Sequence, residues 1–167
     1  MLIFSSQLIV LVTGCSPGGL GFETARALAH HHPKLIIVAG RSLDSLNAAT
    51  EQIREEVPSA AIRGLQLDLS KQREVRKAAK DFNAWHDTPQ LDILINNAGV
   101  MDCPYELNED KIESQFATNH IGHFLFTNLI LEKISKAGNE ARIVNLSSAG
   151  HQQGGVRFDD YNFSVFI

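Results

Sequence analysis

The segment Thr13-Gly14-Cys15-Ser16-Pro17-Gly18-Gly19-Leu20-Gly21 decides the fold of this 167-residue chain. It follows an apolar run at residues 8–12 and leads into residues 19–31, which have helical spacing. Glycines between a strand and a helix permit a tight turn and let a pyrophosphate approach the main chain at the positive end of the helix. The segment therefore predicts a dinucleotide site, and a glycine-rich turn without a ligand is the alternative. No Gly-Lys-Ser/Thr follows, so a triphosphate P-loop is excluded.

Short β-branched runs alternate along the chain with longer stretches of helical spacing. Strands are predicted at residues 8–12, 35–39, 61–66, 91–95 and 142–146, and helices at residues 19–31, 43–56, 71–86 and 108–135. Apolar strands separated by helices indicate a parallel sheet covered on both faces, and right-handed crossovers give a doubly wound α/β layer of the Rossmann type. We expect one domain over residues 1–167 with an incomplete sheet of about five strands in the order 3-2-1-4-5. Asp44 and Ser70 are expected to be helix N-caps.

The composition excludes several other classes of protein. The chain has 44% hydrophobic residues, 20% charged residues and a net charge of -4, so we expect no basic face for nucleic acid. No apolar run reaches the ~18 residues of a membrane-spanning helix. Cys15 and Cys103 have no metal-like spacing around them, so we expect reduced thiols, no metal and a cytoplasmic protein.

The end of the second predicted strand indicates which dinucleotide is bound. NAD enzymes place an acid there, roughly 20 residues beyond the glycine loop, to hold the ribose hydroxyls. Here residues 38–42 read Val-Ala-Gly-Arg-Ser, so Gly40 takes the acidic position and Arg41 follows it. A carboxylate would repel a 2′-phosphate, whereas a guanidinium can bind one bidentately. NADP is therefore favoured over NAD, and the alternative is that Arg41 only extends into solvent from the strand end.

Four further segments join the glycine loop, in order along the chain. They are Asp68-Leu69, Asn96-Asn97-Ala98-Gly99, Phe116-Ala117-Thr118-Asn119-His120-Ile121-Gly122-His123-Phe124 and Arg142-Ile143-Val144-Asn145-Leu146-Ser147-Ser148. Together the five segments resemble the short-chain dehydrogenase/reductase family, and in particular its retinol-dehydrogenase-like branch with its fungal relatives. One departure is an extra residue in the glycine loop, which the pair Gly18-Gly19 can absorb because glycine tolerates a positive φ.

The resemblance implies a role for each matching residue. The expected cofactor-binding residues are Gly14, Ser16, Gly19, Leu20 and Gly21 in the phosphate loop, Arg41 at the 2′-phosphate, Asp68 and Leu69 at the adenine, and Asn97, Ala98 and Gly99 on the adenosine ribose side. Asn119 would hold a water in a proton relay, and Ser148 would hydrogen-bond the substrate carbonyl or hydroxyl.

Alternatives stay open for several of these residues. Asn96 and Asn97 can serve only to tie a strand to its loop, and Asp68 can simply precede a helix cap. His120 and His123 lie on a helix flank and are expected to be packed or solvated and not catalytic.

The acid/base pair of the family is not found in this sequence. In the family a Tyr carries out general acid–base catalysis, and a Lys four residues later supplies the ammonium that brings a pKa of ~10 toward neutrality. Tyr161 lies thirteen residues after Ser148, a spacing that the family often uses, but Val165 stands where the Lys would be. Residues 156–163 resemble instead an insertion that precedes the catalytic helix.

These observations lead to three hypotheses about function. The first is an NADP-dependent oxidoreductase that acts on an alcohol or carbonyl substrate, present as an N-terminal fragment that is inactive alone and whose residues 142–146 form a sheet edge. The second is a non-catalytic NAD(P)-binding or regulatory protein. The third is a relic that does not fold stably. The resemblance also implies a homodimer that uses the helix predicted at residues 108–135.

Overall fold

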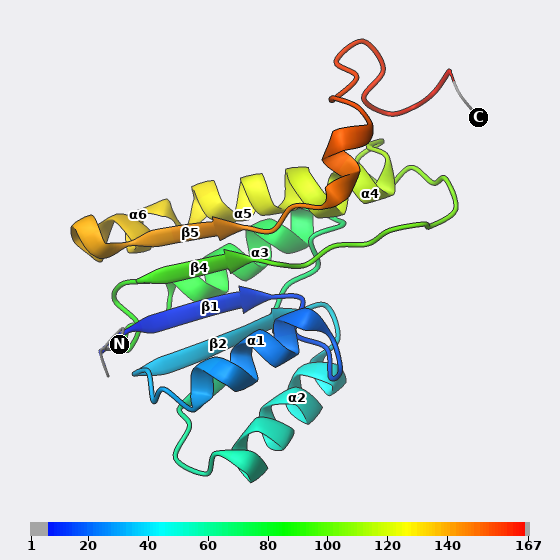
Figure 1. Cartoon of the computed structure of the whole chain (residues 1–167). Coiled ribbons are helices and arrows are strands. Elements are labelled where there is room, and N and C mark those ends of the chain that lie inside the picture. The colour runs from blue at the N-terminus through cyan, green and yellow to red at the C-terminus, as the bar shows by residue number, and fades with distance from the viewer. Residues whose placement is uncertain (1–6, 166–167) are drawn as a thin grey trace.

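The computed structural model describes residues 7–165 and contains a five-stranded parallel sheet with the strand order β3-β2-β1-β4-β5 (Figure 1). The strands are β1 (Ile9–Thr13), β2 (Leu35–Gly40), β3 (Ile62–Gln66), β4 (Ile93–Asn96) and β5 (Arg142–Asn145). All four neighbouring pairs run parallel. The predicted doubly wound sheet and its strand order are confirmed.

Helices cover both faces of the sheet (Figure 1). On one face lie α1 (Leu20–Ala29) and α2 (Leu43–Glu56), and on the other lie α3 (Gln72–Asn83), α5 (His123–Leu129) and α6 (Leu131–Lys136). Alternate residues of a strand point to opposite faces, so Val10 and Val12 join the first layer of the core while Leu11 joins the second. Because both faces are covered, β1 is buried along its whole length.

The long helix predicted at residues 108–135 is wrong over its first six residues, 108–113. The amide oxygen of Asn108 accepts the main-chain N–H groups of Asp110 at 3.0 Å and Ile112 at 2.9 Å, which stabilises a turn in place of a helix. The helix begins only after Glu113, whose carboxylate caps it. It then runs through α4 (Ser114–Phe116), a π-helical turn (Ala117–Gly122), α5 and, after a break at Ile130, α6.

Both predicted N-caps are also wrong. Ser42 caps α2, and its hydroxyl accepts the N–H of Ser45 at 3.3 Å. Ser70 does not cap α3, which begins at Gln72 with Lys71 as its N-cap, and the Ser70 hydroxyl donates to Asp68 instead. The first N–H of α3 donates to Asp110 at 2.9 Å, so a residue distant in sequence satisfies it.

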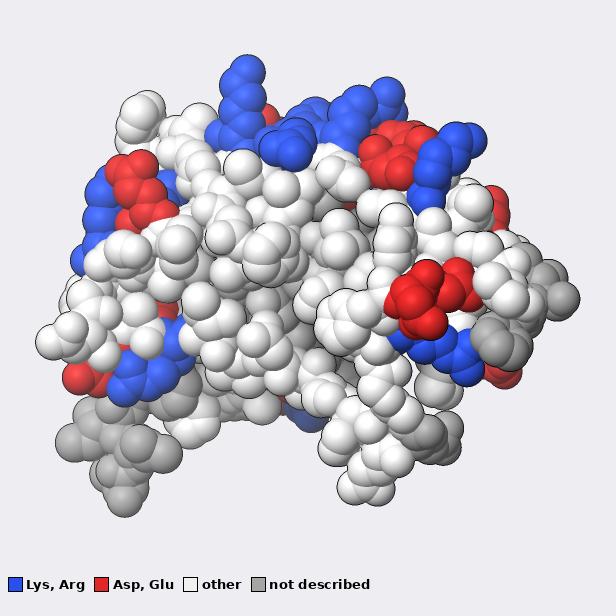
Figure 2. Space-filling model, turned by 90° about the horizontal axis from the view of Figure 1, so that it is seen from above, with Lys and Arg blue, Asp and Glu red and all other residues white. Residues whose placement is uncertain are grey.

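Strand β5 lies at the edge of the sheet, as predicted for residues 142–146. It pairs with β4, but all of its residues are exposed, including Ile143 at 40% and Val144 at 43%. Seen from above, the middle of the molecule is almost free of charged side chains, whereas Lys and Arg gather along one edge (Figure 2). Among residues 7–165, no helix is long and apolar enough to cross a membrane.

Candidate functional site

The glycine loop turns the chain sharply between β1 and α1. The N–H of Gly19 donates to the carbonyl of Ser16 at 2.9 Å, which closes a turn with Pro17 at its second position. Gly18 takes the third position with a φ of 77°, as a type II turn requires. The extra residue of this loop is therefore accommodated at Gly18, and Gly19 is left to start the helix.

Glycine is required elsewhere in the loop because main chains come into contact. A Cβ on Gly21 would lie 2.6 Å from the main-chain carbonyl oxygen of Gly14 and 2.6 Å from the side-chain nitrogen Nδ2 of Asn97. Gly19 is the N-cap of α1 in an extended conformation, and no side chain caps the helix. The first N–H groups of a helix have no partner within it, so this uncapped end can bind an anion.

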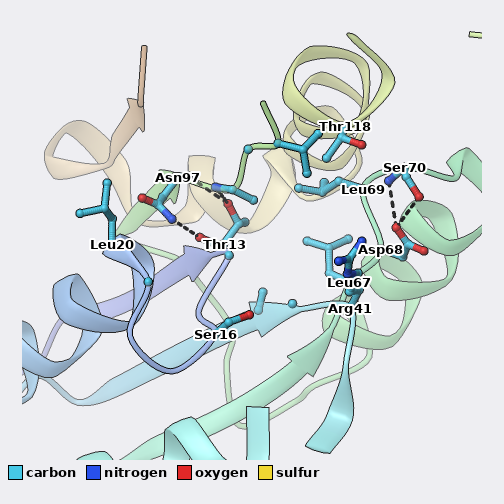
Figure 3. A pocket seen from close by; sticks show the side chains of 17 residues that line it. Thr13, Ser16, Leu20, Arg41, Leu67, Asp68, Leu69, Ser70, Asn97 and Thr118 are labelled. Atoms are coloured by element: carbon cyan, nitrogen blue, oxygen red, sulfur yellow. Dashed lines mark hydrogen bonds between the residues drawn. The ribbon is translucent and has the colours of Figure 1, made fainter. Parts of the chain in front are cut away.

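A cavity of about 350 Å³ opens where the strand order reverses at β1 (Figure 3). Such a switch point is where open α/β sheets bind their ligands. Its lining contains every predicted cofactor-binding residue except Gly21, which is buried behind the loop: Gly14, Ser16, Gly19, Leu20, Arg41, Asp68, Leu69, Asn97, Ala98 and Gly99. It also contains residues that sequence reasoning missed: Thr13, Ala39, Leu67, Ser70, Val100 and Thr118.

Arg41 and Asp68 lie on one side of this cavity, across from Ser16 and Leu20 (Figure 3). Arg41 is exposed, and within the part of the chain that the structure describes its guanidinium has no hydrogen-bond or ion-pair partner. Asp68 binds the N–H of Ser70 at 3.0 Å and its hydroxyl at 2.6 Å, both through Oδ1. Oδ2 of Asp68 has no partner among the described residues, so a cation and a carboxylate oxygen that line this cavity are both available to a ligand.

A second cavity, of about 1120 Å³, adjoins the first and contains the two predicted catalytic residues, Asn119 and Ser148. The cavities share Leu20 and the loop at residues 97–100, so they lie side by side, and we refer to the two together as the groove. Leu20 is 80% exposed, which is unusual for a leucine and places an apolar side chain at the junction. Tyr161 does not line this cavity and instead packs its ring against Phe116.

Asn119 and Ser148 differ in how free their side chains are. Both polar atoms of the Asn119 amide bind the main chain of Val100: Oδ1 accepts its N–H and Nδ2 donates to its carbonyl, both at 2.8 Å. Ser148 is exposed and caps a short 3₁₀ turn, with its hydroxyl accepting the N–H of Gly150 at 3.2 Å. The hydroxyl proton of Ser148 remains available to a ligand in the groove.

Two titratable groups near the loop have shifted pKa values. Burial raises the pKa of the Cys15 thiol to about 12, and its sulfur donates to the carbonyl of Val12 at 3.2 Å, so this thiol is not a nucleophile near neutral pH. Burial lowers the pKa of His123, which is only 6% exposed. The structure describes no group of three His, Cys, Asp or Glu residues that could hold a metal ion.

This combination of sheet, glycine loop and groove is typical of Rossmann-type dinucleotide-binding domains. The sequence profile described as short chain dehydrogenase matches residues 8–164, so the chain belongs to the short-chain dehydrogenase family, as its motifs predicted. Among its relatives are the chloroplastic short-chain dehydrogenase TIC 32 A of Brassica napus and retinol dehydrogenase 13 of Homo sapiens. The first is 46% identical, and the alignment covers 96% of this chain and 51% of the relative. The second is 44% identical, with 93% of this chain and 46% of the relative covered, and the retinol-dehydrogenase-like resemblance is thereby confirmed.

Solved structures share the fold. An uncharacterized protein from Mycobacterium paratuberculosis superposes with a TM-score of 0.78 at 35% identity, over 95% of this chain and 53% of that chain. A short chain dehydrogenase from Escherichia coli CFT073, complexed with NADPH, superposes with a TM-score of 0.72 at 26% identity, over 93% of this chain and 64% of that chain. The chain spans about half the length of the curated relatives it matches.

Proposed function

We propose that residues 1–167 form one NADP(H)-binding domain of a short-chain dehydrogenase/reductase that transfers hydride between the cofactor and an alcohol or carbonyl substrate. One observation carries the proposal. The uncapped N-terminus of α1 and the unpartnered guanidinium of Arg41 line the same cavity, so that cavity has two separate positions for negative charge.

The residues of the cavity fit a dinucleotide phosphate at both positions. Gly14 and Gly19 leave the main chain at the start of α1 bare, and its N–H groups can bind the pyrophosphate. Arg41 can bind the 2′-phosphate, and Oδ2 of Asp68 can accept a hydrogen bond from the adenine amino group. The short-chain dehydrogenase from Escherichia coli, which has the same fold, was crystallised with NADPH, which supports the choice of cofactor.

The second cavity is the proposed substrate side of the groove. A bound nicotinamide cofactor supplies or takes up a hydride there. The Ser148 hydroxyl can donate a hydrogen bond to the substrate oxygen, which stabilises charge as it develops on that atom. Both polar side-chain atoms of Asn119 already bind Val100, which favours the main-chain carbonyl of Asn119 as the group that would hold a relay water.

We also propose that these 167 residues bind the cofactor but do not turn over a substrate. The two tyrosines of the sequence, Tyr105 and Tyr161, are followed four residues later by Glu109 and Val165, so neither belongs to a Tyr-x-x-x-Lys motif. Loss of general acid–base catalysis typically costs ~10²–10⁴-fold in rate.

A second candidate is a non-catalytic NAD(P)-binding or regulatory protein. It would use the same cavity, and the lack of a Tyr-x-x-x-Lys pair in the sequence favours it. Titration of the purified chain with NADPH tests the cavity on which both functions depend, and the activity of a longer product of the same gene separates them. Binding without turnover of simple aldehydes and ketones agrees with both. A longer product of the same gene that carries Tyr-x-x-x-Lys and oxidises NADPH supports the enzyme, whereas an equally inactive longer product supports the regulatory protein. Absence of binding by folded protein contradicts both.

Two further features belong to this proposal. We expect a homodimer formed through the α5 face, where Phe124 is 63% exposed, and sedimentation analysis checks it. We expect the protein in the cytoplasm because both cysteines are free thiols, although the relative from Brassica napus is named as chloroplastic. Fractionation of source cells checks the compartment.

A further inference from the structure

His123 connects the two cavities through both nitrogens of its ring. Its Nε2 lies 2.9 Å from the hydroxyl of Thr13 at the end of β1, and its Nδ1 lies 3.1 Å from the carbonyl oxygen of Asn119. Thr13 lines the first cavity, and His123 and Asn119 line the second. A single buried imidazole therefore contacts the cofactor side and the substrate side of the groove.

The Thr13 hydroxyl has one proton and two lone pairs, and its neighbours determine how they are used. The N–H groups of Asn97 and Ala98 both donate to this oxygen at 3.0 Å, which occupies the two lone pairs. The proton is left to donate either to Nε2 of His123 at 2.9 Å or to the carbonyl of Ile95 at 3.5 Å. The shorter distance favours the imidazole as acceptor.

The tautomer of His123 follows from these contacts. A carbonyl only accepts hydrogen bonds, so Nδ1 must carry the proton that it donates to Asn119. Nε2 is then unprotonated and accepts from Thr13, which makes the imidazole neutral. An imidazolium would aim a second N–H at an oxygen whose lone pairs are already occupied, so protonation would break one of the contacts to Asn97 or Ala98.

The resulting hydrogen bonds form a closed ring. Thr13 holds Ala98, Asn119 holds Val100 through two bonds of 2.8 Å, and His123 joins Thr13 to Asn119. The ring encloses residues 97–100, which form the wall common to both cavities. We propose that His123 is a positioning residue that fixes this wall for the cofactor by clamping the end of β1 to the π-helical turn.

This inference goes beyond the assignment of cofactor residues but rests on the proposed function for its affinity readout. The charged and titratable surroundings of His123 are simple. His120, on the same helical segment, is the titratable group that acts on it, and its charge opposes protonation. The packed neighbours on β1 and on the loop after β4 present the Thr13 hydroxyl and main-chain N–H groups.

Nitrogen-15 NMR of the full 167-residue chain tests the ring without any substitution. The expected result at pH 7.5 is a neutral His123 with the proton on Nδ1 and slow exchange of the Asn97 and Ala98 amides with solvent. A proton on Nε2, or a charged ring at that pH, would overturn the proposal. This test holds even if the chain binds no dinucleotide, so failure of the proposed function is distinguishable from failure of the ring.

Substitutions test the effect on the cofactor. His123→Leu removes both contacts, and we expect the NADPH dissociation constant to rise about tenfold and exchange of the Ala98 amide to accelerate by a similar factor. In His123→Asn the shorter side chain should keep only the contact to Asn119, and in His123→Gln the amide should keep only the contact to Thr13. Each should therefore change the dissociation constant and the amide exchange less than leucine does. These two variants keep the test usable if the leucine variant does not fold. His86→Asn, an exposed histidine away from the groove, is the matched control and should behave as the unaltered chain. Unchanged affinity and exchange in all three His123 variants would overturn the proposal.

Discussion

Gly14 and Ala98 are in direct contact across the carboxyl end of the sheet: a Cβ built on Gly14 would lie 2.8 Å from the Cα of Ala98. The glycine loop after β1 is thus packed on the loop after β4 with no room for a side chain. The φ of Gly14 is 76°, in the left-handed region, so both the backbone conformation and the contact with Ala98 require glycine at this position. This contact joins the two loops that carry most of the predicted cofactor residues.

Gly14→Ala should therefore destabilise the protein by more than backbone strain alone. We expect a loss of about 2–4 kcal/mol in the free energy of unfolding, from strain and from displacement of the Ala98 main chain. Gly18→Ala is the matched control, because Gly18 has a φ of 77° but no atom within 4 Å of its would-be Cβ. It should cost only about 1–2 kcal/mol. Urea denaturation of both variants measures the difference, and equal losses would contradict the contact.

Arg41→Ala should weaken NADPH much more than NADH. A charge-assisted hydrogen bond contributes about 1.5–3 kcal/mol, which corresponds to a roughly 10- to 100-fold higher dissociation constant for NADPH. NADH, which lacks the 2′-phosphate, should change less than about threefold. Calorimetric titration of both cofactors measures this, with the exposed Arg76 on α3 replaced by Ala as the control. An equal loss for the two cofactors would show that Arg41 does not meet the 2′-phosphate.

The stability of the fold should fall as the pH drops below about 6.5, the usual pKa of an unfolded-state histidine. Burial lowers the pKa of His123 in the folded state, so the unfolded chain binds the proton more readily between the two pKa values. The stabilisation is complete above about 6.5 and is lost as the pH falls through the folded-state pKa. Denaturation at several pH values checks this direction, and His123→Asn should show a shallower dependence on pH in this range.

Lys133→Met should destabilise the fold through unsatisfied carbonyl groups. The ammonium of Lys133 is buried, donates to the carbonyls of Trp85 and Thr88, and lies 5.0 Å from the ring centre of Phe82. We expect a loss of about 2–3 kcal/mol in the free energy of unfolding.

The matched control for that substitution is Lys136→Met. Lys136 is exposed and pairs with Glu132 one turn earlier at 2.6 Å. Such a surface pair contributes about 0.3–0.5 kcal/mol, so thermal unfolding should barely change. Similar shifts in the two methionine variants would argue against a structural role for the buried ammonium.

Much of the fold could be predicted because it follows local pattern. The apolar runs and helical spacing located all five strands, and the glycine loop located the cavity at β1. The N-cap of α3 could not be predicted, because it depends on the turn in which Asp68 accepts the N–H and the hydroxyl of Ser70 before the helix begins at Gln72. Thr13 and His123 were missed as partners because 110 residues separate them, and only the folded sheet brings them together.

The central claim is that a pyridine dinucleotide phosphate binds with its pyrophosphate at the start of α1 and its 2′-phosphate at Arg41. Titration of the isotope-labelled chain with NADPH, followed residue by residue through the amide signals, tests this claim most directly. We expect saturable shifts concentrated at residues 14–21, 41, 68–69 and 97–100. Folded protein whose signals do not move, or move only outside these residues, would contradict it.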